Sequence, residues 1–93
     1  MASRKNLKKD IDYLITELVA DCYACIYENP DMDFSGLEEI INNAVSLRED
    51  LTSRINQFDN KTMGKSRPYF NDIKKDLVDG LTDNYKKLEK LVE

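Results

Sequence analysis

The sequence predicts an all-α protein, a bundle of three long antiparallel helices in up-down-up order at residues 3–28, 34–58 and 68–91. Apolar residues recur at steps of three and four along three long segments, so each segment has one apolar face that a helix buries only against partners. Both prolines, Pro30 and Pro68, fall in the gaps between the apolar stretches. The chain has three glycines and two prolines, too few for the frequent turns of an all-β domain.

Each segment carries one apolar stripe. The first consists of Leu7, Ile11, Leu14, Ile15, Leu18, Cys22, Cys25 and Ile26. The second consists of Leu37, Ile40, Ile41, Ala44, Val45, Leu47, Leu51, Ile55 and Phe58. The third consists of Phe70, Ile73, Leu77, Leu81, Tyr85, Leu88, Leu91 and Val92. The stripes use nearly every large apolar residue, and we expect them to form one shared core.

The first helix is expected to begin near Ser3, whose hydroxyl would cap free backbone amides, and to stop before Asn29-Pro30. Two residues compete to cap the second helix. Ser35 would form a capping box with Glu38, whereas Asp33 would let Phe34 begin the helix with an apolar anchor. We favour Asp33, which sets the start of this helix at residue 34.

The third helix is expected to follow an aperiodic stretch, residues 59–67, with Pro68 in its first turn, where the missing N–H has no cost. Gly80 lies inside this helix and costs about 1 kcal/mol relative to alanine. It either permits a close helix crossing, allows a mild bend, or is tolerated on the outside. The sequence leaves these three alternatives open.

Length and composition indicate one domain, residues 1–93, with 41% hydrophobic and 34% charged residues. The chain has no histidine, which excludes Ser-His and Cys-His nucleophile pairs and His-ligated zinc or haem. Acid–base chemistry would have to come from carboxylates, lysine or tyrosine, and none of these can be placed as a catalytic group. We therefore expect a protein that is not an enzyme and holds no cofactor or small-molecule ligand.

The net charge of −4 is unfavourable for binding to a nucleic-acid backbone, which requires clustered cations. The basic opening segment, residues 1–10, is followed by acidic residues that interrupt any apolar run, so no signal peptide is expected. No segment has the apolar length of a membrane span. These observations predict a cytoplasmic protein with reduced cysteines and without nucleic-acid or membrane partners.

Cys22 and Cys25 form a C-x-x-C pair, the spacing of dithiol redox centres and of half a zinc site. Redox motifs of this kind lie at a helix N-terminus, but this pair lies near the predicted C-terminal end of a helix. A zinc site needs four ligands, which only a dimer of two such motifs would supply. Because both cysteines lie on the apolar stripe, we interpret them as core residues, with a metal or redox site as the alternative.

Residues 31–36 match the first six positions of an EF-hand loop, D-x-D-x-S-G, with ligand candidates Asp31, Asp33, Ser35 and Glu39. Position twelve, where calcium requires a bidentate glutamate, is Asn42. The other interpretation is a helix N-terminus carrying acidic residues that suit the helix dipole. A weak calcium-binding loop is therefore a further hypothesis.

Three tyrosines, Tyr13, Tyr23 and Tyr27, lie to one side of the first stripe. They either border the core with solvated hydroxyls or widen the apolar face into a contact surface for another chain. They are the residues that we select as interaction-surface candidates.

The opening Leu7 to Leu14, with its long predicted helix, and the third segment with Tyr69 and Tyr85 resemble small uncharacterised all-helical proteins of Bacteroides-type bacteria. That resemblance implies a bacterial, cytoplasmic helical bundle and carries no activity or site residue.

The leading hypothesis for function is a non-enzymatic interaction or structural module that self-associates as a homodimer or binds another protein. Three long helices share a thin core, so apolar residues beyond it, such as Val19, Tyr23 and Val78, favour a partner.

Overall fold

The computed structural model describes residues 4–92, and this part of the chain is all-α, as the sequence predicts. It contains four helices: α1 (Arg4–Glu28), α2 (Phe34–Gln57), α3 (Asn60–Met63) and α4 (Ser66–Val92). The prediction of three helices is corrected by α3, a single turn in the stretch expected to lack structure. Asp59 caps α3 by accepting a hydrogen bond from the Lys61 backbone N–H at 2.9 Å. Because this contact is local, the spacing of apolar residues does not reveal it in the sequence.

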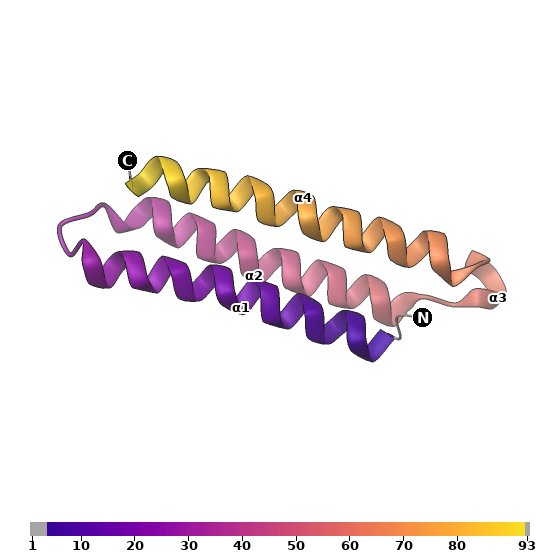
Figure 1. The fold of residues 1–93 in the computed structure, drawn as a ribbon. Helices are drawn as coiled ribbons and strands as arrows, with labels where there is room; N and C mark the ends of the chain where they lie inside the picture. Colours follow the sequence, from indigo (N-terminus) through magenta and orange to yellow (C-terminus); the bar gives the residue numbers. More distant parts are fainter. Residues whose placement is uncertain (1–3, 93) are drawn as a thin grey trace.

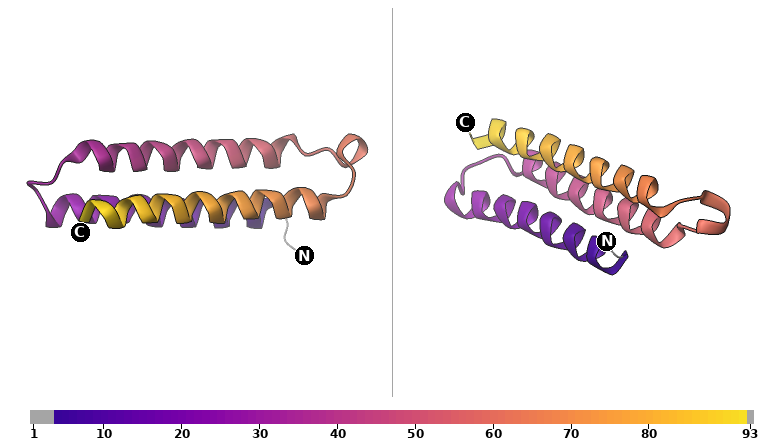
Figure 2. Two further views of the ribbon diagram at one scale, coloured as in Figure 1. Left: turned by 90° about the horizontal axis from the view of Figure 1, so that it is seen from above. Right: turned by 45° about the vertical axis from the view of Figure 1, so that its right-hand side comes forward.

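The three long helices lie side by side in a rod of about 53 × 18 × 18 Å (Figure 1). The turns that join them, residues 29–33 and 58–65, lie at opposite ends of the rod. Figure 2 shows α2 on one side, with α1 and α4 together on the other. Helix α2 packs along both of its neighbours, whereas α1 and α4 contact each other over much less of their length.

The helix boundaries follow local capping. Asp33 caps α2 as predicted, because its carboxylate accepts the Ser35 backbone N–H at 3.0 Å. Phe58, expected to be the last helical residue, is instead the extended C-cap residue of α2. Helix α4 begins two residues before the predicted Pro68, which still lies in its first turn. The proposed Ser3 cap lies outside the described residues.

The core is built from the three predicted stripes. Its fully buried large side chains, each stabilising the fold by about 1.5–3 kcal/mol, are Ile11, Leu18, Leu37, Ile40, Leu51, Ile55 and Ile73. Val45 and Val92, which we placed on stripes, are instead 42% and 48% exposed because they lie at the edges of their apolar faces. Asn84 is buried without having been predicted; it donates to the Gly80 carbonyl at 2.9 Å and accepts from Asn43 at 3.5 Å.

Two glycines allow α2 and α4 to approach each other closely. A Cβ at Gly36 of α2 would lie 2.7 Å from Leu91 Cδ2 of α4, and one at Gly80 of α4 would lie 2.6 Å from Leu47 Cδ2 of α2. Each helix thus contributes one glycine and one leucine to a reciprocal pair of contacts. The structure selects a close crossing among the three alternatives for Gly80.

An aromatic cluster closes the α3 end of the rod. The ring of Phe58 lies 4.9 Å from that of Tyr69 and 5.2 Å from that of Phe70, centroid to centroid. Arg4 joins the start of α1 to this cluster, because its guanidinium lies 5.4 Å from the Phe58 ring and donates to the Phe58 carbonyl at 3.0 Å. Tyr69 donates its hydroxyl to the Arg54 carbonyl at 2.7 Å. In the part of the chain described, no helix has the length and apolar character needed to cross a bilayer.

Candidate functional site

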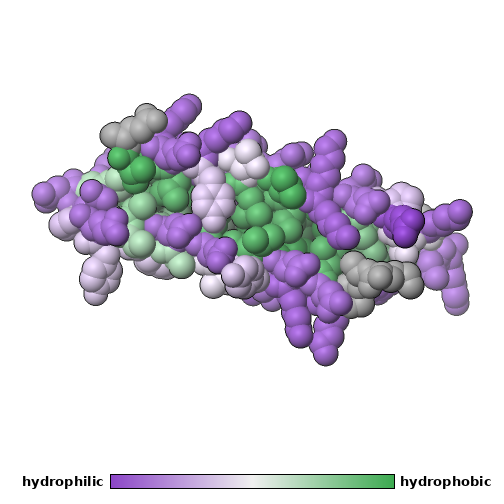
Figure 3. All heavy atoms as spheres, in the orientation of Figure 1, coloured by the Kyte–Doolittle hydropathy of each residue, from purple (hydrophilic) through white to green (hydrophobic). Residues whose placement is uncertain are grey.

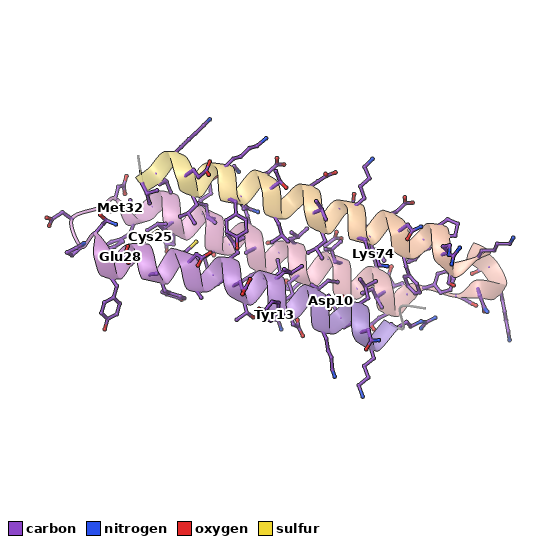
Figure 4. All side chains as sticks on the ribbon, viewed as in Figure 1. Asp10, Tyr13, Cys25, Glu28, Met32 and Lys74 are labelled. Atoms are coloured by element: carbon purple, nitrogen blue, oxygen red, sulfur yellow. The ribbon has the colours of Figure 1, made fainter. Side chains whose placement is uncertain are left out.

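The candidate site is the surface between α1 and α4, which we call the α1–α4 face. It contains a hollow of about 330 Å³ lined by Leu7, Asp10, Tyr13, Leu14, Lys74, Leu77 and Val78. Figure 4 shows Asp10 and Tyr13 on α1 and Lys74 on α4 in the same half of the rod. The hollow forms here because α1 and α4 pack mainly on α2 and only sparsely on each other.

The lining of the hollow is largely apolar and accessible. Leu7 and Leu77 form a buried floor, while Tyr13 and Val78 are 64% and 59% exposed. In Figure 3 apolar side chains are exposed in patches along this side of the molecule, with polar side chains between them and at the margins. An exposed apolar hollow with a polar rim is typical of a protein-binding surface, because leaving it in water has a free-energy cost.

Polar contacts continue the face beyond the hollow. The Tyr85 hydroxyl of α4 forms a hydrogen bond with Asp21 of α1, and Glu17 lies nearby. Burial, then the negative charge of Asp21, raises the pKa of Tyr85. Tyr13 forms a hydrogen bond with Glu17 one turn away, and this contact raises the pKa of Tyr13. Both tyrosines are therefore neutral hydrogen-bonding groups at ordinary pH, and neither is suited to act as a base.

Four carboxylates form a row along the α4-facing side of α1: Asp10, Glu17, Asp21 and Glu28. Their spacings of seven, four and seven residues are close to whole numbers of helical turns, so they share one side of the helix. Their surroundings agree with that side: Asp10 lines the hollow, Asp21 and Glu17 lie near Tyr85, and Glu28 lines a second hollow together with Leu91 and Val92. Within residues 4–92, no ion pair links any of the four to a cation.

The three tyrosines that we selected from the sequence do not form one site. Tyr13 lines the α1–α4 hollow, whereas Tyr23 and Tyr27 lie about 15 and 21 Å further along α1. They are 57% and 91% exposed. Phe34, the first residue of α2, is 46% exposed. The end of the molecule near the α1–α2 turn therefore carries a second, separate group of exposed aromatic rings.

The C-x-x-C pair is part of the apolar packing. Cys22 is fully buried in the core, Cys25 is half-buried against it, and both are free thiols. Burial is the main cause that raises the pKa of each thiol, and the charges of Asp21 and Glu28 add to it. No group of three or more Cys, Asp or Glu side chains among the described residues is arranged to hold a metal ion.

The residues of the EF-hand-like motif are used to start α2. Asp33 directs its carboxylate to the Ser35 backbone N–H and to the Ser35 hydroxyl, the latter at 2.8 Å. Ser35, Gly36 and Glu39 are already helical, so residues 31–42 do not form a twelve-residue loop. Glu39 lies 3.9 Å from the Lys87 ammonium, and Asp31 lines a shallow hollow at the turn with Glu28 and Met32 (Figure 4).

Sequence reasoning selected Tyr13 as an interaction-surface candidate and Val78 as an apolar residue outside the core, and both line the hollow, but it did not bring the two together in one site. Asp10, Lys74 and the Tyr85–Asp21 contact come together only through the packing of α1 beside α4, which are distant in sequence. The regular spacing of the four carboxylates on α1 is a further signal in the sequence that would have indicated this face.

Comparison with known proteins adds no candidate, since no protein family, curated protein or solved structure matches this chain.

Proposed function

We propose that this protein is a non-enzymatic interaction module, in which an up-down-up bundle of three long antiparallel helices presents the α1–α4 face to another protein. The observation that carries the proposal is the exposed, largely apolar hollow between α1 and α4, with Tyr13 and Val78 more than half exposed at its rim. Its acidic margin would give a partner a preferred position on the face.

The chemistry of the remaining candidate residues favours binding over catalysis. Cys22 and Cys25 lie in apolar surroundings that disfavour the thiolate, the reactive form of the side chain. Burial and then the nearby Asp21 raise the pKa of Tyr85, and Glu17 raises the pKa of Tyr13. Because no nucleophile is paired with a base among residues 4–92, a binding role accounts for the exposed groups more simply.

A site-specific photo-crosslinker tests the proposal in cells that express the protein. With a benzophenone amino acid in place of Val78, irradiation should give discrete adducts. The matched control is the same amino acid at Glu49, an exposed position on α2. Adducts at position 78 and none at position 49 would support the α1–α4 face, whereas the same pattern at both positions, or none at 78, would overturn it.

Self-association is the second candidate function, favoured by the exposed rings of Tyr23, Tyr27 and Phe34. A homodimer would cover these rings and give a mass twice the 10.8 kDa of the chain. Light scattering at micromolar concentration distinguishes the two forms. If the wild-type chain is a monomer in this measurement and Tyr23→Lys has the same mass, the homodimer is contradicted.

A further inference from the structure

We propose that the α1–α4 face binds a basic amphipathic helix. This helix would lie as a fourth long helix along the line where α1 and α4 meet on that face, which we call the seam. This inference rests on the proposed function and specifies the partner. Helix α2 occupies one side of both α1 and α4, and the opposite side of that pair is where the hollow lies. A fourth helix placed there would contact α1 and α4 at once, as in a four-helix bundle.

The apolar part of the partner is set by the hollow. Leu14, Leu77 and Val78 present aliphatic carbons between the two helices, and Tyr13 adds a ring at the edge. Side chains such as leucine, repeated at steps of three and four along the partner, would bury these atoms. The acidic row spans Asp10 to Glu28, about 27 Å of helix, and this length corresponds to a partner segment of roughly eighteen residues.

The charge of the partner is set by the acidic row. Four carboxylates face the seam: Asp10, Glu17, Asp21 and Glu28. Among the described residues that line the seam, Lys74 is the one cation. None of the four carboxylates is neutralised by an ion pair within residues 4–92. Lysine or arginine on the flank of the partner would lie opposite this row, whereas an acidic helix would be repelled.

A second copy of this chain fits the charges less well. If two copies meet with α1 against the partner's α4, Lys74 is the one seam-lining cation available to four carboxylates. If α1 meets α1, two acidic rows oppose each other. A basic helix from a different chain avoids both arrangements, and charge complementarity therefore selects it as the occupant.

The test uses the full chain and two fluorescent synthetic peptides of about eighteen residues that share one leucine stripe. One peptide carries lysine on its flanks and the other glutamate. By fluorescence anisotropy, the lysine peptide should bind at least about tenfold more tightly than the glutamate peptide, and added salt should reduce this difference. Equal binding of the two peptides, or binding of neither, would overturn the inference.

Charge variants locate the effect. Asp10→Asn with Glu17→Gln should weaken binding of the lysine peptide by about tenfold. The control, Glu38→Gln with Glu49→Gln on α2, removes the same charge elsewhere on the exposed surface and should leave binding unchanged. Charge reversal with Asp10→Lys and Glu17→Lys should transfer the preference to the glutamate peptide. An equal loss in the control variant would indicate attraction to net charge alone and would contradict a seated helix.

The two proposals fail in different ways. If the glutamate peptide binds as tightly as the lysine peptide and Val78→Lys abolishes both, the α1–α4 face is a binding site but its partner is not selected by charge. If crosslinks from position 78 are absent in cells, the face itself is not used. Dimers crosslinked through position 78 would assign the face to a second copy and overturn the basic helix.

Discussion

Leu47 of α2 packs directly over Gly80 of α4, so that a Cβ at position 80 would lie 2.6 Å from Leu47 Cδ2. Gly80→Ala is expected to change the free energy of unfolding by less than about 1 kcal/mol, because the better helix propensity of alanine is offset by the movement that its Cβ requires of the flexible end of Leu47. Urea unfolding followed by circular dichroism measures this change.

The same substitution should become clearly stabilising once the leucine is shortened. In a Leu47→Ala background, Gly80→Ala meets no δ-methyl groups and is expected to stabilise the protein by up to about 1 kcal/mol. If Gly80→Ala has the same effect in both backgrounds, the contact between the two residues does not determine the cost.

Asp33 starts α2, and Asp33→Ala is expected to lower the Tm by about 4 °C because the Ser35 backbone N–H loses its acceptor. Asp31→Ala, two residues earlier and outside the cap, is the control and should leave the Tm nearly unchanged. Calorimetry at neutral pH measures both.

The cap should also depend on pH. The hydrogen bond from the Ser35 backbone N–H lowers the pKa of Asp33 in the folded protein. The stabilisation is therefore present above the pKa of the unfolded chain and is lost as the pH falls through the lower, folded pKa. The difference in Tm between wild type and Asp33→Ala should shrink below about pH 3.8. A difference that is constant across this range would show that the carboxylate charge does not contribute.

Both thiols should react slowly with alkylating reagents at neutral pH, because burial raises their pKa values and keeps them protonated. Cys25, half-buried, should react before Cys22, which has no exposed surface. Single variants Cys22→Ala and Cys25→Ala assign the two rates by mass spectrometry. A rate close to that of free cysteine, or zinc bound in a fixed ratio to the purified chain, would restore the metal or redox hypothesis.

Tyr85 should make the protein less stable at alkaline pH. Its pKa is raised in the folded state, so its contribution is complete below the ordinary tyrosine value of 10.0 and is lost as the pH rises through the folded value. Tyr85→Phe is expected to reduce the fall in Tm above about pH 10. The control is Tyr27→Phe, at a position 91% exposed. If the Tm of Tyr85→Phe falls as steeply above about pH 10 as that of the wild type, ionisation of Tyr85 is not the cause of the alkaline loss of stability.

Periodicity predicted the helical class and most of the core, because long helices with three- and four-residue apolar spacing have few ways to bury their stripes. Capping chemistry correctly predicted that α2 starts at Phe34. The cap is a local interaction, because the Asp33 side chain accepts a hydrogen bond from the backbone N–H of Ser35, two residues further along the chain. The same local reasoning missed α3, which hydrogen bonds from Lys61 and Thr62 to Asp59 hold in place. It also missed the burial of Asn84, which depends on Asn43 from another helix.

The candidate site was less accessible to sequence reasoning. Exposure of Tyr13 and Val78 follows from their positions off the stripes, but the hollow between them exists only because α1 and α4 pack mainly on α2 and contact each other sparsely. The EF-hand-like motif left two interpretations open because Asp33 and Ser35 suit both a calcium loop and a helix start. In the structure these residues start α2, and Gly36 contacts Leu91.

The central position of α2 has a consequence for the order in which the molecule opens. If α1 detaches, the contacts of Gly36 and Gly80 still join α2 to α4, and if α4 detaches, the α1–α2 packing remains. Separation of α2 from both neighbours, however, leaves α1 and α4 with little to hold them together. Amide hydrogen exchange should therefore be slowest in the middle of α2, and the buried amides of α1 and α4 should exchange through partial openings that leave α2 protected.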